Sequence, residues 1–133
     1  MLEAVSAMAS VMGDPYLLGL ITVTTILGIV IGVLPGLGAT TGAALLLPFT
    51  LTMDPVHAIA VLATLDVSAP FAGSITAILI NTPGTSAAAA TTFDGFPLAQ
   101  RGEAGRALGV AVVSSTIGGI FSILVLCLSL IHI

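Results

Sequence analysis

The chain has 133 residues, of which 57% are hydrophobic and only 6% are charged. Soluble domains carry roughly a quarter charged residues, so this composition predicts a polytopic membrane protein. A net charge of −4 with two basic residues, both Arg, excludes a basic surface for nucleic acid, and a single cysteine, Cys127, excludes an internal disulfide.

The first apolar stretches predict an N-terminal segment and then a membrane span. Leu2, Val5, Met8 and Met12 recur at helical spacing, which is typical of a short interfacial helix or of an unstructured apolar lead-in. Met1 is not followed by the basic region of a cleaved signal, so we expect the next span to remain in the mature chain. Residues 16–34 are uncharged and long enough to cross the bilayer, which predicts the first transmembrane helix.

A first helix break follows at Pro35-Gly36-Leu37-Gly38, because Pro removes a backbone donor and Gly permits left-handed geometry. Residues 39–51 are apolar, but about 13 helical residues reach only about 20 Å, so they predict a half-helix. The turn at Asp54-Pro55 supplies an N-cap and a first-turn proline, and it predicts a second helix through Ala69.

A second break is predicted further along the chain. Pro70 and Gly73 are expected to interrupt the second helix, and Asn81-Thr82-Pro83-Gly84-Thr85 separates an apolar run ending at Ile80 from a half-helix over residues 86–92. Residues 71–92 therefore predict a re-entrant hairpin with its tip at 81–84. Residues 93–105 predict a polar loop, and residues 107–126 predict a third spanning helix.

Two breaks in apolar sequence predict a binding site, because irregular backbone at membrane depth is tolerated only inside protein or beside a water-filled cavity. The free N–H groups and positive dipole of a half-helix attract an anion, and interrupted carbonyls attract a cation such as Na⁺. We expect Gly84 to let the backbone approach a ligand. The candidate substrate-binding residues are Pro35, Gly36, Gly38, Thr40, Thr41, Asn81, Thr82, Pro83, Gly84, Thr85 and Ser86.

Each hydroxyl in this set has an alternative role, which is to cap a half-helix or to bond between helices. Asp66 lies mid-span, where a carboxylate is costly; together with Ser74 it is a candidate ion-coupling site, or it hydrogen-bonds Ser68. His57 and His132 have no partners at metal-ligand spacing, and no enzyme motif is present, so neither an enzyme nor a metal site is predicted.

The ordered motifs resemble a known family. Gly32-Val33-Leu34-Pro35-Gly36-Leu37-Gly38-Ala39, Leu47-Pro48, Gly73 to Ser86, Phe93-Asp94-Gly95-Phe96-Pro97-Leu98-Ala99 and Gly102 to Gly109 resemble the large membrane subunit of tripartite tricarboxylate transporters, the TctA family. The resemblance implies a multi-pass subunit of the bacterial inner membrane without a cofactor, driven by an ion gradient of Na⁺ or H⁺. It also implies a periplasmic solute-binding protein, a small four-helix membrane subunit and a carboxylate substrate.

The resemblance divides the chain into two parts. Residues 1–127 correspond to one N-terminal half-repeat of the membrane domain, so the remaining half of the same polypeptide is an expected partner. Residues 128–133 resemble a translated sequencing adaptor and are excluded from the fold prediction. The predicted fold is thus all-α, with three or four spanning helices and re-entrant half-helices. A small membrane scaffold without a transport site, or a channel, are the alternatives.

The loop over residues 93–105 is predicted to face the cytoplasm, because it and its border carry the two basic residues, Arg101 and Arg106. A cysteine at Gln100, in a chain whose Cys127 is replaced by Ser, should therefore resist a membrane-impermeant maleimide added to intact cells. It should react once the cells are permeabilised. Rapid reaction in intact cells would reverse the orientation.

Overall fold

The computed structural model describes residues 13–132. It contains the helices α2 (Pro15–Val33), α3 (Ala39–Thr50), α4 (Pro55–Ile80), α5 (Thr91–Gln100) and α6 (Ala104–His132) and the short 3-10 helix η1 (Ser86–Ala88). The described residues form no strand, and α2, α4 and α6 are long and apolar enough to cross a membrane. The all-α class with three spanning helices is confirmed, whereas the interfacial helix predicted at Leu2–Met12 lies outside the described residues.

The predicted helix starts and the first break are confirmed. Asp14 caps α2 by accepting a hydrogen bond from the Tyr16 N–H at 2.9 Å, and Asp54 caps α4 through the Val56 N–H at 3.1 Å. Gly36 has a φ of +89°, a left-handed conformation that glycine adopts without strain. The half-helix after it, α3, has 12 residues and reaches only about 18 Å, short of a hydrocarbon core of about 30 Å.

The interruption predicted at Pro70 and Gly73 is wrong, because α4 runs unbroken for 26 residues through both. Proline removes one hydrogen bond from a helix, a loss that membrane helices tolerate where neighbouring segments pack against them. Gly73 is small for packing and does not break the helix. A Cβ there would lie 2.7 Å from the Thr85 Oγ1 of the returning chain.

The re-entrant segment was predicted over residues 71–92. Because α4 continues to Ile80, this segment instead covers residues 81–100. Asn81 ends α4 in the left-handed conformation, and the Gly84 N–H donates to the Gly73 carbonyl at 3.3 Å. The chain thus returns along α4 to about 10 Å below the C-terminal end of that helix, at a rise of about 1.5 Å per residue. After η1, α5 runs back along α4, with Gly95 packed against Ile78.

Two further predictions for this segment are corrected. The half-helix predicted over residues 86–92 is only the three-residue η1, and most of the polar loop predicted over residues 93–105 is α5. Gly95, which looked like a loop residue, is buried because it allows the α5 backbone to approach α4. Within the predicted loop, only the turn between α5 and α6 is irregular, and Gly102 in that turn has a φ of +82°.

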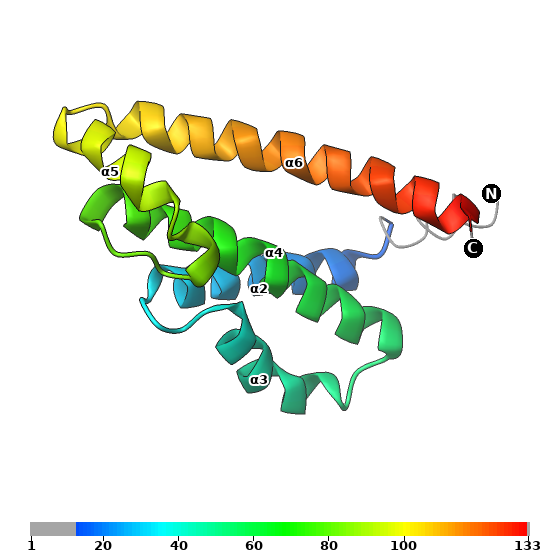
Figure 1. The fold of residues 1–133 in the computed structure, drawn as a ribbon. Helices are drawn as coiled ribbons and strands as arrows, with labels where there is room; N and C mark the ends of the chain where they lie inside the picture. The colour runs from blue at the N-terminus through cyan, green and yellow to red at the C-terminus, as the bar shows by residue number, and fades with distance from the viewer. Residues whose placement is uncertain (1–12, 133) are drawn as a thin grey trace.

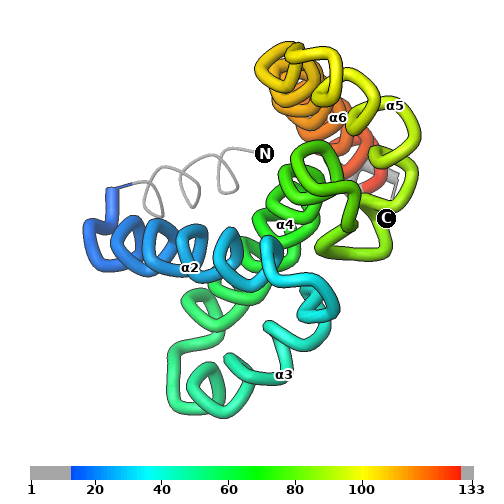
Figure 2. The backbone as a smooth tube through the Cα atoms, turned by 90° about the vertical axis from the view of Figure 1, so that its left-hand side faces the viewer, coloured from blue at the N-terminus to red at the C-terminus, as the bar shows by residue number. Residues whose placement is uncertain are grey.

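Helices α2 and α4 run in the same general direction and cross at close range, as Figures 1 and 2 show. Near their starts, Asp14 lies 3.5 Å from His57. Further along, a Cβ on Gly28 would collide with the Ser68 hydroxyl, and one on Gly32 would collide with the Ala69 carbonyl oxygen. The spacing Gly-x-x-x-Gly thus brings the two backbones together, as in other membrane helix pairs.

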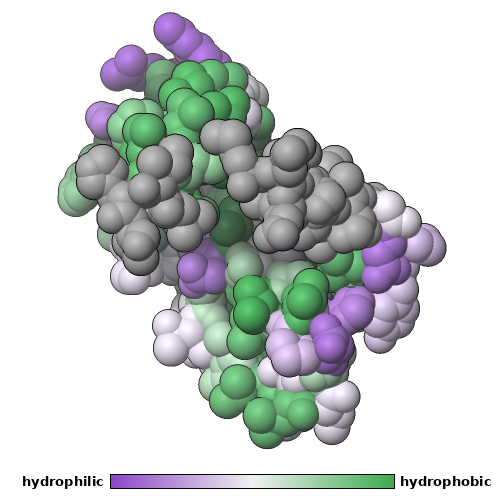
Figure 3. All heavy atoms as spheres, turned by 90° about the vertical axis from the view of Figure 1, so that its right-hand side faces the viewer, coloured by the Kyte–Doolittle hydropathy of each residue, from purple (hydrophilic) through white to green (hydrophobic). Residues whose placement is uncertain are grey.

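Helix α6 runs antiparallel to α4 and packs on α4 and α5 mainly near its own start, where Ala107 is 5% exposed (Figure 1). Beyond that point its large apolar side chains are exposed, as at Ile117, Phe121 and Leu124. Seen from the end at which α2 and α4 begin, the visible surface carries hydrophobic patches and several hydrophilic clusters (Figure 3). The exposed apolar side chains along α6 suit a lipid or protein environment.

The close α2–α4 contact predicts a sharp contrast between glycines of one helix. Gly32→Ala should lower the free energy of unfolding in detergent by about 1–3 kcal/mol, because the added methyl group meets backbone that cannot turn away. Gly19→Ala is the matched control, since nothing lies within 4 Å of a Cβ at Gly19. Equal stability of the two variants would contradict the contact.

Candidate functional site: the two helix breaks

The structure brings the two predicted breaks together at the C-terminal end of α2. Gly84 of the second break is buried between α2 and α4, where a Cβ would collide with the Gly32 carbonyl oxygen and lie 2.9 Å from the Gly73 Cα. Gly38 of the first break lies beside the second break as well, since a Cβ there would be 4.0 Å from the Thr85 Cγ2. Segments nearly 50 residues apart in sequence thus share one site.

Gly84 has a structural reason for its small size. Its N–H donates to the Gly73 carbonyl, and its Cα is enclosed by the backbones of α2 and α4. The glycine therefore admits neighbouring protein rather than a ligand, and this N–H is already used. A bulky residue there would disturb the fold itself, so substitutions at Gly84 do not isolate a binding role.

Thr85 is the member of the set with an unsatisfied polar group. The residue is 9% exposed, and its buried Oγ1 has no hydrogen-bond partner among the described residues. A buried hydroxyl without a partner costs about 1–3 kcal/mol, and such groups are uncommon in native structures. Thr85 is thus the donor best suited to a ligand at the joined breaks.

The start of α3 supplies further donors on the other side of the site. Gly38 is the N-cap and offers no side chain, and the first helical bond runs from the Gly42 N–H to the Gly38 carbonyl. The N–H groups of residues 39–41 are therefore free of the helix ladder, and they carry its positive dipole end. Pro35, Gly36, Thr40 and Thr41 are exposed around this helix start.

The other candidates of the second break lie at its rim. Asn81 caps α4 through its N–H to the Thr76 carbonyl, and the Thr82 hydroxyl donates to the Ile80 carbonyl at 3.3 Å. Both residues are exposed, as is Ser86, and Pro83 is half-buried. Capping therefore explains Asn81 and Thr82 without a ligand.

The two ion-coupling candidates do not share a site. Asp66 is exposed on α4 and forms no ion pair with any described residue. Its predicted alternative is not formed either, since the Ser68 hydroxyl donates to the Thr64 carbonyl at 2.7 Å. Ser74 instead faces a cavity between α4, α5 and α6, which Asp66 does not line.

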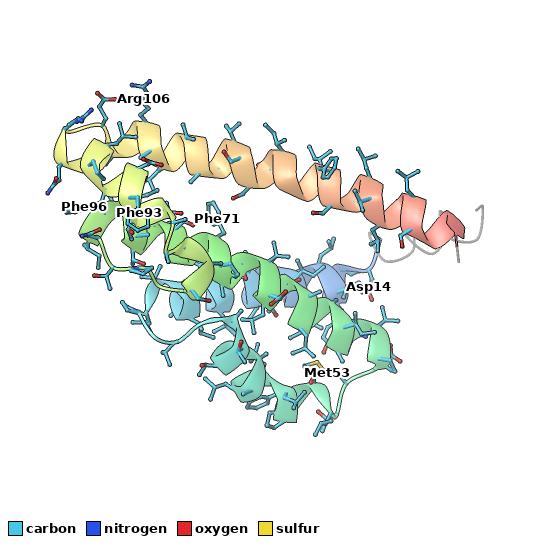
Figure 4. The ribbon with its side chains drawn as sticks, viewed as in Figure 1. Asp14, Met53, Phe71, Phe93, Phe96 and Arg106 are labelled. Atoms are coloured by element: carbon cyan, nitrogen blue, oxygen red, sulfur yellow. The ribbon has the colours of Figure 1, made fainter. Side chains whose placement is uncertain are left out.

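One polar cluster was missed by the sequence analysis. His57 packs edge-on against the Tyr16 ring at 5.2 Å, and its two ring nitrogens lie 3.5 Å from the Asp14 carboxylate and 3.7 Å from that of Asp54. The Tyr16 N–H bond is the main cause that lowers the pKa of Asp14. Figure 4 places Asp14 at the end of the bundle opposite Arg106. The two Asp-Pro helix starts were the available signal for this cluster.

The fold and the joined breaks define a multi-pass membrane protein with a re-entrant segment. Residues 18–133 match the family described as Tripartite tricarboxylate transporter TctA family, and the chain belongs to that family of transporters.

A relative in Agrobacterium vitis is described as an uncharacterized 52.8 kDa protein in the TAR-I ttuC' 3' region; it is 43% identical over 107 residues, or 80% of this chain. The chain spans 21% of that relative's length. No solved structure matches this chain.

Proposed function

We propose that the chain is part of the permease subunit of an ion-gradient-driven uptake system for tricarboxylates or related small carboxylates. The system depends on a periplasmic solute-binding protein and a small four-helix membrane subunit, and it lies in the bacterial inner membrane. The observation that carries the proposal is the meeting of two helix breaks around a buried, unpartnered Thr85 hydroxyl. The subunit moves its substrate without chemical change, so it is not an enzyme.

The chemistry of the joined breaks suits an anion. The Thr85 hydroxyl and the free N–H groups at the start of α3 are hydrogen-bond donors, and the dipole of α3 adds positive potential. The two arginines, Arg101 and Arg106, are exposed at the turn before α6 and at its start, away from this site. A carboxylate bound here is recognised by neutral donors, which release it more readily than a buried Arg would.

A membrane scaffold without a transport site is the second candidate, and the packing of Gly84 favours it. The contacts of Gly84 have a structural explanation within α2 and α4. The scaffold, however, gives no reason for a buried hydroxyl that lacks a partner. The two functions therefore make opposite predictions for Thr85.

Replacing Thr85 with Val removes the hydroxyl and keeps the shape of the side chain. In the full-length transporter, Thr85→Val should raise the apparent KM for carboxylate uptake about tenfold or more, as expected for the loss of a donor to a charged group. The same change should leave thermal stability unchanged or higher, because a buried group without a partner disappears. Uptake is measured with labelled citrate and succinate in proteoliposomes.

Thr92→Ala provides the control, since the Thr92 hydroxyl already bonds the Ala89 carbonyl at 2.7 Å on the outer side of α5. It should leave KM unchanged. Wild-type uptake by a well-folded Thr85→Val protein would refute the role of this hydroxyl, and counterflow exchange in the same vesicles separates a carrier from a channel.

A further inference from the structure

A cavity of about 310 Å³ lies between α4, α5 and α6, on a face of α4 different from the one that packs on the joined breaks. Ser74 of α4 lines it, together with Thr91 and Asp94 of α5 and Ser114 and Ser115 of α6. The remaining lining is apolar, with Ile78, Leu98 and Val110 among the contributors. Three helices thus place oxygen-bearing residues around one partly open cavity, at which Asp94, Ser114 and Ser115 are exposed.

The oxygens of this cavity are not engaged elsewhere. Thr25, Thr76 and Thr116, on three other helix turns, each donate to a carbonyl of their own helix, at 2.8, 3.1 and 2.8 Å. No hydrogen bond within the described residues involves the side chains of the five cavity residues, and Asp94 forms no ion pair there.

The position of the cavity gives it access to membrane depth. Ser74 and Ser115 also line an adjoining groove of about 590 Å³. This groove reaches Pro70 of α4 and Ala87 of η1 in the re-entrant segment. Pro70 lies about 15 Å below the C-terminal end of α4 at about 1.5 Å per residue. Phe71 projects from α4 into the space under α6 (Figure 4).

The charge and the ligand atoms select the class of ligand. One carboxylate with four hydroxyls is an all-oxygen set with a single negative charge, which neutralises a monovalent cation. Divalent Ca²⁺ and Mg²⁺ sites generally use more than one carboxylate or substrate phosphates. An anionic substrate is repelled by Asp94, which separates this cavity from the anion-binding breaks.

We propose that Asp94, Ser74, Thr91, Ser114 and Ser115 form a monovalent-cation site of the Na⁺ class between α4, α5 and α6. In a transporter this ion is the coupling ion, which is the one respect in which the inference rests on the proposed function. The site replaces Asp66 as the location of ion binding. Asp66 lines neither this cavity nor the adjoining groove.

The test is direct Na⁺ binding to the purified full-length transporter in nanodiscs without any carboxylate. Binding is measured by the ²³Na NMR linewidth while choline replaces Na⁺ at constant ionic strength. Because no substrate is present, failure here leaves the uptake proposal standing, and failure of uptake leaves this one standing. Circular dichroism shows that every variant retains its helices.

Asp94→Asn should raise the apparent Kd for Na⁺ about tenfold or more, and Thr91→Ala should raise it less, because one neutral ligand is lost. Thr92→Ala, one residue along and bonded to the Ala89 carbonyl, is the matched control and should bind Na⁺ like the wild type.

Asp66→Asn decides between the two carboxylates and should retain Na⁺ binding. If Asp94→Asn does not fold, the Ser74→Ala, Ser115→Ala double variant replaces it and should show the same loss. The proposal is overturned by any of three results: no saturable Na⁺ effect in the wild type, wild-type affinity in folded Asp94→Asn or in the double variant, or loss of binding in Asp66→Asn alone.

Discussion

The close contact between α2 and α4 is the constraint on which the rest of the structure depends. Gly28 and Gly32 place the α2 backbone against Ser68 and Ala69, and the contact continues where Gly84 fills the space between Gly32 and Gly73. In a bilayer the hydrophobic effect does not drive helices together, so such an interface relies on van der Waals contact between backbones. This interface holds the second break in place. The start of α3 lies beside that break.

This arrangement divides α4 into two working faces. Gly73 belongs to the face that receives α2 and the returning break, and the adjacent Ser74 belongs to the face toward α5 and α6. The proposed anion site lies beside the first face, and the proposed cation site lies beside the second. Helix α4 therefore lies between the two proposed sites.

The sequence predicted the start of α4 and the first break well, because Asp54-Pro55 and Pro35-Gly36 act through local geometry. It failed at Pro70 and Gly73, where tertiary packing outweighs the local tendency to break. For the same reason α5 was predicted as a loop: its few apolar residues become helical only by packing on α4. The meeting of Gly38 with Thr85, and the cluster at His57, join residues distant in sequence, and no periodicity in one chain reveals such pairs.

The central claim is that the two breaks meet, and cysteine cross-linking in the membrane tests it most directly. With Cys127 replaced by Ser, Gly38→Cys with Thr85→Cys should form a disulfide on mild oxidation, because a Cβ at Gly38 lies 4.0 Å from the Thr85 Cγ2 and the two side chains are neighbours. The pair Ile78→Cys with Gly95→Cys, whose Cβ positions are 3.6 Å apart, is the positive control. Peptide mass spectrometry that finds the control disulfide but none between positions 38 and 85 would contradict the account.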